Sequence, residues 1–295
     1  MQEVMKKIKA RALSLLADGT VKRVLGWERG EDAFDCSPAL FENEAEMERF
    51  VYGTCAGANL SKYCVKMGKA EGKTLVILKP CDTLSFRQLL HEHRVERDAF
   101  YIIGAGCTGM KDENGLLAKC AACKGKEFAV YDEIIDTEEC RLPTGTENRM
   151  EQVEKLENMT AEERFAFWQG ELSRCIRCNA CRNVCPACSC EKCVFDNDNS
   201  GVKNKAAADS FEENMFHIIR AFHVASRCTD CGECSRVCPQ HIPLHLLNRK
   251  FIKDINELYG PYMAGADLNT KPALMDYTKD DCEPSIVYER NGGAQ

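Results

Sequence analysis

Apolar residues in the first half of the chain occur in short continuous runs, separated by longer amphipathic stretches. The segments 73–79 (KTLVILK) and 100–104 (FYIIG) are almost entirely apolar, which is typical of strands buried on both faces of a sheet. We predict two more strands at 50–53 and 127–135, and helices at 58–67 and 82–91. Strands that alternate with helices form βαβ units, so we expect an α/β domain with a mostly parallel sheet.

The hydrophobic pattern changes after residue 148. A polar stretch at 149–172 favours helix, and Thr160 with Glu163 forms a capping-box pattern within it. Amphipathic helices are predicted at 211–225 and 244–255, and the chain becomes irregular beyond 259. The pattern predicts four parts: an α/β domain at 1–148, a helical linker at 149–172, an all-α domain at 173–258 and an irregular tail at 259–295.

The composition points to a globular protein with metal sites. Of the 295 residues 44% are hydrophobic, and the net charge of −7 comes without a long basic stretch, which argues against nucleic acid as a partner. The 20 cysteines could form a disulfide scaffold or bind metals. The first residues lack the apolar core of a signal peptide, and no apolar run reaches the ~20 residues of a membrane span. We therefore expect a soluble, cytoplasmic protein whose thiols are mostly reduced.

Two cysteine runs in the second half share one spacing, C-x₂-C-x₂-C-x₃-C-P: CIRCNACRNVCP at 175–186 and CTDCGECSRVCP at 228–239. This spacing presents three thiolates to one cubane cluster, and the fourth cysteine binds the cluster of the other run. The runs therefore predict two [4Fe–4S] clusters. One is assigned to Cys175, Cys178, Cys181 and Cys238, and the other to Cys228, Cys231, Cys234 and Cys185. Zinc is the alternative, although structural zinc usually takes two C-x₂-C pairs.

The segment 228–243, with CTDCGEC followed by CPQHIP, resembles the alpha-helical ferredoxins of succinate dehydrogenase iron–sulfur subunits and of the heterodisulfide reductase C subunit. This resemblance implies two [4Fe–4S] clusters packed between helices. Between the two runs lie Cys188, Cys190 and Cys193, which could hold a further metal or shield the first cluster.

Four cysteines in the first half converge on one edge of the predicted sheet. Cys81 follows the strand at 73–79 and Cys107 follows the strand at 100–104, and ligands bind at the carboxyl ends of parallel strands. Cys120 and Cys123 arrive one loop later. These four thiols predict a third [4Fe–4S] cluster. The alternative is that Cys81 and Cys107 are small core residues and that Cys120 and Cys123 form a zinc pair or a redox dithiol.

The motifs around these cysteines (KPCD at 79–82, IGAGC at 103–107 and KCAAC at 119–123) resemble the coenzyme F-420 hydrogenase/dehydrogenase beta-subunit family. The resemblance implies a subunit with flavin (FAD) and iron–sulfur clusters that links a redox enzyme to a soluble carrier. The glycines at 53–57 and 104–106 serve equally well as phosphate loops or as turns. The remaining cysteines, Cys36, Cys55, Cys64, Cys140 and Cys282, have no motif partners, and most of them are expected to be ordinary thiols. Cys55 alone could reach the same sheet edge.

Together these features predict an iron–sulfur electron-transfer subunit of an anaerobic oxidoreductase complex. By resemblance, its partners are subunits of hydrogenase, formate dehydrogenase or heterodisulfide reductase type and a flavoprotein, in an assembly that could be electron-bifurcating. No nucleophile–base pair is recognisable, so no catalytic residue is predicted. Two alternatives stay open: an FAD-containing reductase that exchanges hydride with a deazaflavin or nicotinamide, and a zinc-rich interaction protein.

Overall fold

The computed structural model describes residues 1–142, 144–145, 147–196, 211–272 and 274. Its first part is built on a six-stranded sheet with the order β2-β1-β4-β5-β8, with β3 also paired to β1. The strands are β1 (Arg23–Arg29), β2 (Cys36–Phe41), β3 (Phe50–Val51), β4 (Thr74–Leu78), β5 (Phe100–Ala105) and β8 (Glu133–Ile135). β1, β4, β5 and β8 are parallel neighbours, whereas β2 and β3 pair antiparallel with β1. The prediction of a mostly parallel α/β sheet is confirmed.

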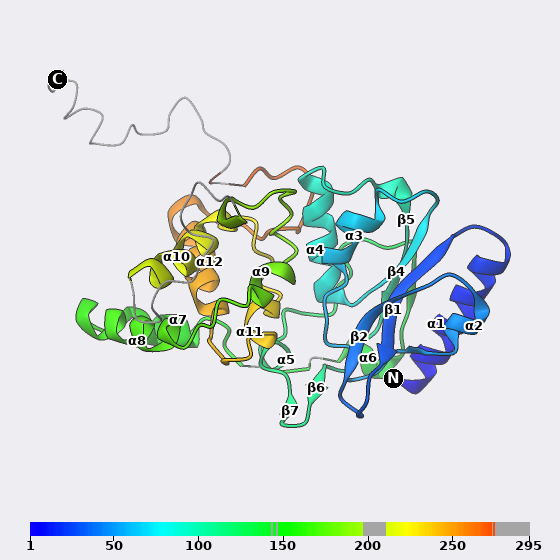
Figure 1. Cartoon of the computed structure of the whole chain (residues 1–295), viewed down its shortest axis with the longest axis horizontal. Coiled ribbons are helices and arrows are strands. Elements are labelled where there is room, and N and C mark those ends of the chain that lie inside the picture. Colours follow the sequence, from blue (N-terminus) through cyan, green and yellow to red (C-terminus); the bar gives the residue numbers. More distant parts are fainter. Residues whose placement is uncertain (143, 146, 197–210, 273, 275–295) are drawn as a thin grey trace, which may run out of the picture.

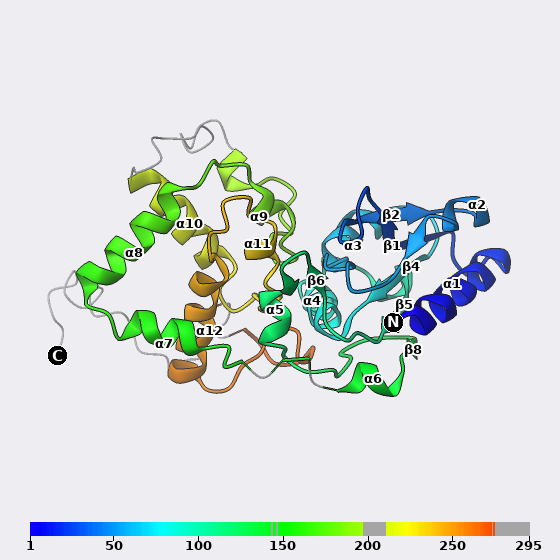
Figure 2. The same cartoon turned by 90° about the horizontal axis from the view of Figure 1, so that it is seen from below.

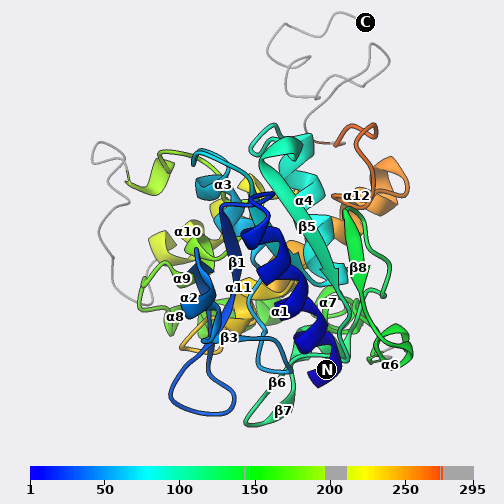
Figure 3. The same cartoon turned by 90° about the vertical axis from the view of Figure 1, so that its right-hand side faces the viewer.

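Helices cover both faces of this sheet. Figures 1 and 3 show α1 (Gln2–Ala17) on one face, and α3 (Ser61–Met67) and α4 (Pro80–His91) on the other. Every residue of β4 is buried, because the strand lies between these two layers. The core contains large apolar side chains from strands and helices alike, including Trp27, Phe41, Phe86 and Phe100. The short elements of this part are α2 (Glu44–Met47), η1 (Arg97–Ala99), β6 (Lys111–Asp112), β7 (Gly115–Leu116), α5 (Ala118–Ala121) and α6 (Glu138–Arg141).

Two strands were missed by the hydrophobic pattern, and one was predicted too long. β1 has only four buried residues between charged ends, and β2 is half-buried at the edge of the sheet, so neither stands out as an apolar run. The segment predicted as a strand at 127–135 pairs only at Glu133–Ile135. Just before it, the Asp132 carboxylate accepts a hydrogen bond from the Ile102 amide at 2.7 Å, which holds the chain beside β5 without extending the ladder.

The second part is formed by helices. They are α7 (Glu151–Glu157), α8 (Ala161–Ser173), α9 (Ala180–Asn183), η2 (Val194–Asp196), α10 (Phe211–His223), α11 (Glu233–Arg236) and α12 (His245–Tyr259). Thr160 and Glu163 form the predicted capping box of α8. α7 packs against α12 and α8 packs against α10, as Figure 2 shows, with Trp168 between two small apolar clusters. The segment predicted as a linker thus packs against α10 and α12 of the predicted all-α domain, and the domain boundaries themselves stay a prediction.

The two parts of the chain are in direct contact. α4 and α5 of the first part face α11 and the loop before it, and residues from the predicted tail return to α4. The Arg87 guanidinium donates to the carbonyl oxygens of Gly265 (2.6 Å) and Ala266. No helix within the described residues is long and apolar enough to cross a membrane.

Two cysteines expected to be unpaired are joined in the structure. Cys36, at the start of β2, and Cys55, in the loop after β3, form a disulfide with a Cα–Cα distance of 5.6 Å. The expectation of two ordinary thiols is wrong here, because the antiparallel pairing of β2 and β3 with β1 brings together residues that are 19 positions apart. Cys64 and Cys140 are buried thiols, as expected, and Cys282 lies outside the described residues.

Candidate functional site

The first cysteine run forms a tight loop followed by a short helix. Arg177 and Asn179 adopt positive φ angles of 53° and 61°, and α9 begins at the next residue, Ala180. The Arg177 amide points back to the Cys175 Sγ at 3.3 Å. Such amide-to-sulfur bonds stabilise a thiolate and are a recurrent way of tuning cluster potentials.

The second run repeats this conformation at every equivalent position. Asp230 and Gly232 have φ angles of 48° and 71°, and α11 begins at Glu233. The Asp230 amide donates to the Cys228 Sγ at 3.4 Å. Equal spacing has therefore produced two equal cradles of backbone and sulfur.

The thiols of the two runs are arranged around separate cavities. One cavity is lined by Cys175, Cys178, Cys181 and Cys238, together with Phe216 and His217 of α10. The other is lined by Cys185, Cys228 and Cys231, together with Ser85, Gln88 and Leu89 of α4. Cys234 lies within electrostatic range of the thiols around this second cavity. The structure thus brings Cys238 to the first run and Cys185 to the second, and ligation by these thiols stays a prediction.

The side chains around these cavities fit a negatively charged group. The guanidinium of Arg220 is only 1% exposed, and none of its three nitrogens has a hydrogen-bond acceptor. Its charged neighbours are thiols from both sets, namely Cys181, Cys185 and Cys234, together with Cys188. A buried cation without a counter-charge is costly, whereas a cluster held by four thiolates supplies negative charge on both sides. Among the described residues, no three His, Cys, Asp or Glu side chains come close enough to share one metal ion.

Burial governs the protonation of the residues at both cavities. Burial raises the pKa of the Cys181, Cys228 and Cys231 thiols, so these thiols are protonated at neutral pH in the protein without metal. Burial, with help from the charges of Arg220 and Arg177, lowers the pKa of His217 to about 3. His217 is therefore neutral, and neither of its ring nitrogens has a hydrogen-bond partner.

At the sheet edge, three of the four predicted thiols come together. β4 and β5 end side by side, with Leu78 paired to Gly104, and this register places Cys81 near Cys107. Cys107 in turn lies within electrostatic range of Cys120, whose Sγ accepts a bond from the Met110 amide at 3.3 Å.

The fourth thiol, Cys123, lies two residues beyond the end of α5 and contacts the Gly125 carbonyl oxygen at 3.7 Å. Lys126 lies beside the other thiols, with its Nζ 2.7 Å from the Cys107 carbonyl oxygen and 3.6 Å from the Cys107 Sγ. The loop from Cys120 to Lys126 thus contributes the Cys120 thiol and a cation to this edge, and ligation by the four cysteines stays a prediction here too.

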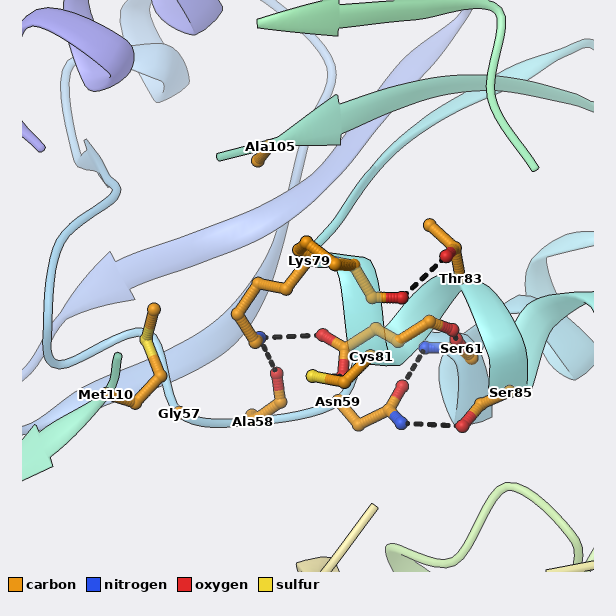
Figure 4. Close-up of polar contacts among 12 residues, drawn as sticks. Gly57, Ala58, Asn59, Ser61, Lys79, Cys81, Thr83, Ser85, Ala105 and Met110 are labelled. Atoms are coloured by element: carbon orange, nitrogen blue, oxygen red, sulfur yellow. Dashed lines mark hydrogen bonds and ion pairs between the residues drawn. The ribbon is translucent and has the colours of Figure 1, made fainter. Parts of the chain in front are cut away.

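A buried lysine, Lys79, lies at this edge of the sheet, two residues before Cys81. Lys79 and Asp82, each 1% exposed, form an ion pair at 2.7 Å, and the Lys79 Nζ also donates to the Ala58 carbonyl oxygen at 2.7 Å. Figure 4 shows Lys79, Cys81 and the loop residues Gly57, Ala58 and Asn59 gathered at this edge. The Lys79 cation also lies 4.5 Å from the centre of the Trp27 ring. Cys81 consequently lies in a first helical turn that the Lys79–Asp82 ion pair anchors.

Glu233 connects the sheet edge to the second cysteine run. It is completely buried, and its carboxylate binds Lys119, Arg236 (2.9 Å) and the Asn59 amide (3.2 Å). Burial alone would raise the pKa of Glu233, but the charges of Lys119 and Arg236 lower it to about 2. The sequence analysis missed Glu233 and Lys119, although each adjoins a predicted ligand; only the contact between the two parts of the chain reveals their roles.

Comparisons with known proteins agree with this geometry. Residues 171–242 match a family model described as a 4Fe-4S dicluster domain. The segment contains both cysteine runs. The chain is also similar to the F420-dependent formate dehydrogenase subunit beta of Methanocaldococcus jannaschii, with 24% identity over 353 aligned residues that cover 89% of this chain and 92% of the relative. A second relative, the F420-dependent formate dehydrogenase 1 subunit beta of Methanococcus maripaludis, is 22% identical, covering 88% and 90%.

These similarities support an iron–sulfur protein related to formate dehydrogenase beta subunits. The predicted resemblance to the beta-subunit family is confirmed at this level. The more specific resemblance of the second part to heterodisulfide reductase C, and the number of clusters, stay predictions.

Proposed function

We propose that this chain is the iron–sulfur electron-transfer subunit of an oxidoreductase complex, with formate dehydrogenase or hydrogenase as its most plausible type of partner. Residues at the sheet edge and around the two cavities would hold three [4Fe–4S] clusters. When bound, each cluster takes up and releases one electron. Partners of heterodisulfide reductase type and electron bifurcation are further expectations of this proposal.

The observation that carries the proposal is the position of α4. Its first turn contributes Cys81 to the sheet edge, and its later turns contribute Ser85, Gln88 and Leu89 to the cavity of the second run. Because a helix rises about 1.5 Å per residue, the two sites are separated by only about 10 Å along this helix. Arg220 lies within electrostatic range of thiols of both cavities. The three predicted sites would thus follow one another through the molecule.

The residues around the three predicted sites hold the cysteine loops in place. Backbone amides point at the sulfurs of Cys175 and Cys228. The Lys119–Glu233 ion pair holds the second run against α5, and a hydrogen bond between the Ser85 and Thr229 hydroxyls (2.7 Å) holds it against α4. A site that is this rigid changes little in structure when its charge changes, which suits one-electron transfer.

Anaerobically purified full-length chain provides the test. We expect at least about eight irons and an equal amount of acid-labile sulfide per chain, and an electron paramagnetic resonance (EPR) signal of reduced [4Fe–4S] after dithionite. Cys107→Ala should remove about four further irons, and Cys64→Ala, at a buried thiol outside every predicted set, should remove none. Zinc in place of iron would overturn the proposal, and unchanged iron in Cys107→Ala would exclude the sheet-edge cluster.

The names of the relatives favour a second candidate, because both are called F420-dependent. In that case the chain is an FAD-containing reductase that exchanges hydride with a deazaflavin or a nicotinamide. Flavin content of the same purified sample, followed by reduction with reduced F420 or NADH, separates the two functions. A flavin that the carrier reduces would support the reductase, and a flavin-free protein would leave the electron-transfer subunit.

A further inference from the structure

A third cysteine-lined cavity lies beside the two already described. It has a volume of about 460 Å³ and is bounded by α3, the end of α9, η2 and α10. Figure 3 shows α3, α9 and α10 on one side of the molecule. Its three thiols belong to the sequence CSCEKC at 188–193, which the predicted function does not use. Its charged lining is mostly cationic and comprises Lys62, Lys66, Arg182, Arg220 and Arg227, opposed by Glu191 and Asp196.

The three thiols are accessible and none of them is in a disulfide. Cys190 is exposed, and Cys188 and Cys193 are half-buried at the cavity wall. A turn flanks this segment on each side: the Cys188 amide donates to the Cys185 carbonyl oxygen at 3.1 Å, and the Asp196 amide donates to the Cys193 carbonyl oxygen at 3.0 Å. A short looped segment therefore presents three soft ligands to one space, as the loops of the two runs do.

The wall of the cavity requires negative charge. Arg220 is buried on this wall, and its guanidinium has no hydrogen-bond acceptor. The Arg182 side chain contacts the Cys193 thiol and pairs with Asp196 at 2.8 Å, and the Lys62 Nζ donates to the Cys188 carbonyl oxygen. Arg227 is paired with Glu92, so the charge available to a bound group is chiefly that of Arg220, Lys62 and Lys66. Two thiolates of a redox dithiol would leave most of the volume unused. A thiolate-bound cluster occupies the volume and supplies the counter-charge.

We propose that Cys188, Cys190 and Cys193 bind an additional iron–sulfur cluster in this cavity. His223 lines the same cavity and is a fourth candidate donor. The site adjoins the cavity of the second run, since the Cys188 thiol contacts the Cys185 thiol, which lines that cavity. It therefore provides a branch by which one electron can leave the series toward the face bounded by α3 and α10. This inference rests on the proposed iron–sulfur function.

The test compares the iron content of anaerobically purified full-length variants. The double variant Cys190→Ala/Cys193→Ala should lose about four irons and four sulfides relative to wild type, and one component of the EPR spectrum. Cys178→Ala should lose about four irons that belong to the cluster of the first run, and Cys64→Ala should lose none. If the double variant keeps all its iron while Cys178→Ala does not, this inference fails and the proposed function stands. If neither variant loses iron, both fail.

A second measurement needs no variant. In the wild-type protein, Cys190 should resist alkylation by iodoacetamide under anaerobic native conditions, and it should react at least tenfold faster after iron is removed by a chelator. Mass spectrometry of the peptide containing residues 188–193 measures this difference. Fast alkylation of Cys190 in the iron-loaded protein would overturn the proposal, and so would a single zinc ion lost by the double variant, because the site would then be mononuclear.

Discussion

The two cysteine runs have the same spacing and the same backbone conformation, yet they lie in different surroundings. In the first run Cys178 is exposed and Ile176 is 52% exposed. In the second run Asp230 and Glu233 are buried and bound by pairs of cations, and the cavity is closed by α4. The cysteine spacing thus determines the backbone conformation of each loop, whereas the neighbouring helices determine how far each loop is exposed to solvent. We expect the second run to be the internal relay and the first to face the partner.

The largest effect, a loss of iron, is expected when one predicted ligand is removed from either run. Cys178→Ala and Cys231→Ala should each cost about four irons. Because the second run lies between the sheet edge and the first run, only Cys231→Ala should also slow reduction of the remaining second-part cluster from the N-terminal site. Iron analysis and freeze-quench EPR measure both effects. Equal rates in the two variants would contradict the assignment of an internal and an external site.

The second-largest effect is expected on thermal stability. It is tested by substitutions at Glu233 and at Ala180, which occupy equivalent positions in the two runs. Glu233→Gln leaves Lys119 and Arg236 buried without their counter-charge, which typically costs about 3–5 kcal/mol. The midpoint of thermal unfolding should fall on the order of 10 °C. Ala180→Gln, on the half-buried counterpart, should change it by no more than a degree or two.

The effect of Glu233 has a defined pH range. Its folded pKa is lowered to about 2, below the ordinary value of 4.5, so the stabilisation is complete above pH 4.5 and is lost as the pH falls toward 2. The difference in unfolding midpoint between wild type and Glu233→Gln should therefore be constant from pH 6 to pH 9. A difference that grows with pH in this range would mean that another group is responsible.

Substitutions of Arg220 test whether one cation influences the sites of both runs. Its unpaired charge lies near thiols of both, and it favours the more negative, reduced state of any cluster there. Arg220→Leu should lower both midpoint potentials, by about 50–100 mV if the interaction is 1–2 kcal/mol. Arg220→Lys keeps the charge and should shift them much less. EPR-monitored redox titration gives both values, and a shift at one run alone would show that Arg220 is not shared.

The smallest effects are expected at the residues with positive φ. An added Cβ at Gly232 would come within 2.7 Å of the Lys119 Cβ in a backbone conformation that disfavours side chains, so Gly232→Ala should destabilise the protein by about 1–2 kcal/mol. Asn179 is its counterpart in the first run, and Asn179→Gly should be neutral or stabilise by up to about 1 kcal/mol. Chemical denaturation under anaerobic conditions measures both. Equal responses would mean that the cradles differ less in packing than the structure indicates.

The cysteine spacing and the apolar runs were sufficient to predict much of this protein. The buried strands at β4 and β5 determined the parallel sheet, and their ends placed Cys81 and Cys107 at one edge. The repeated run predicted the two loops, because two-residue gaps leave few conformations that present three sulfurs together. Strand burial and loop conformation depend mainly on residues close together in the chain, so a short stretch of sequence is enough to predict them.

Only the tertiary structure decided how these pieces meet. The disulfide between Cys36 and Cys55, the ion pair between Glu233 and Lys119 and the shared position of Arg220 all join residues that are far apart in the chain or on different elements. Nothing in the composition distinguishes Arg220 from other arginines, or Glu233 from an exposed glutamate. Their roles arise from burial, because a charge acquires a strong and specific effect only where the fold removes water from around it.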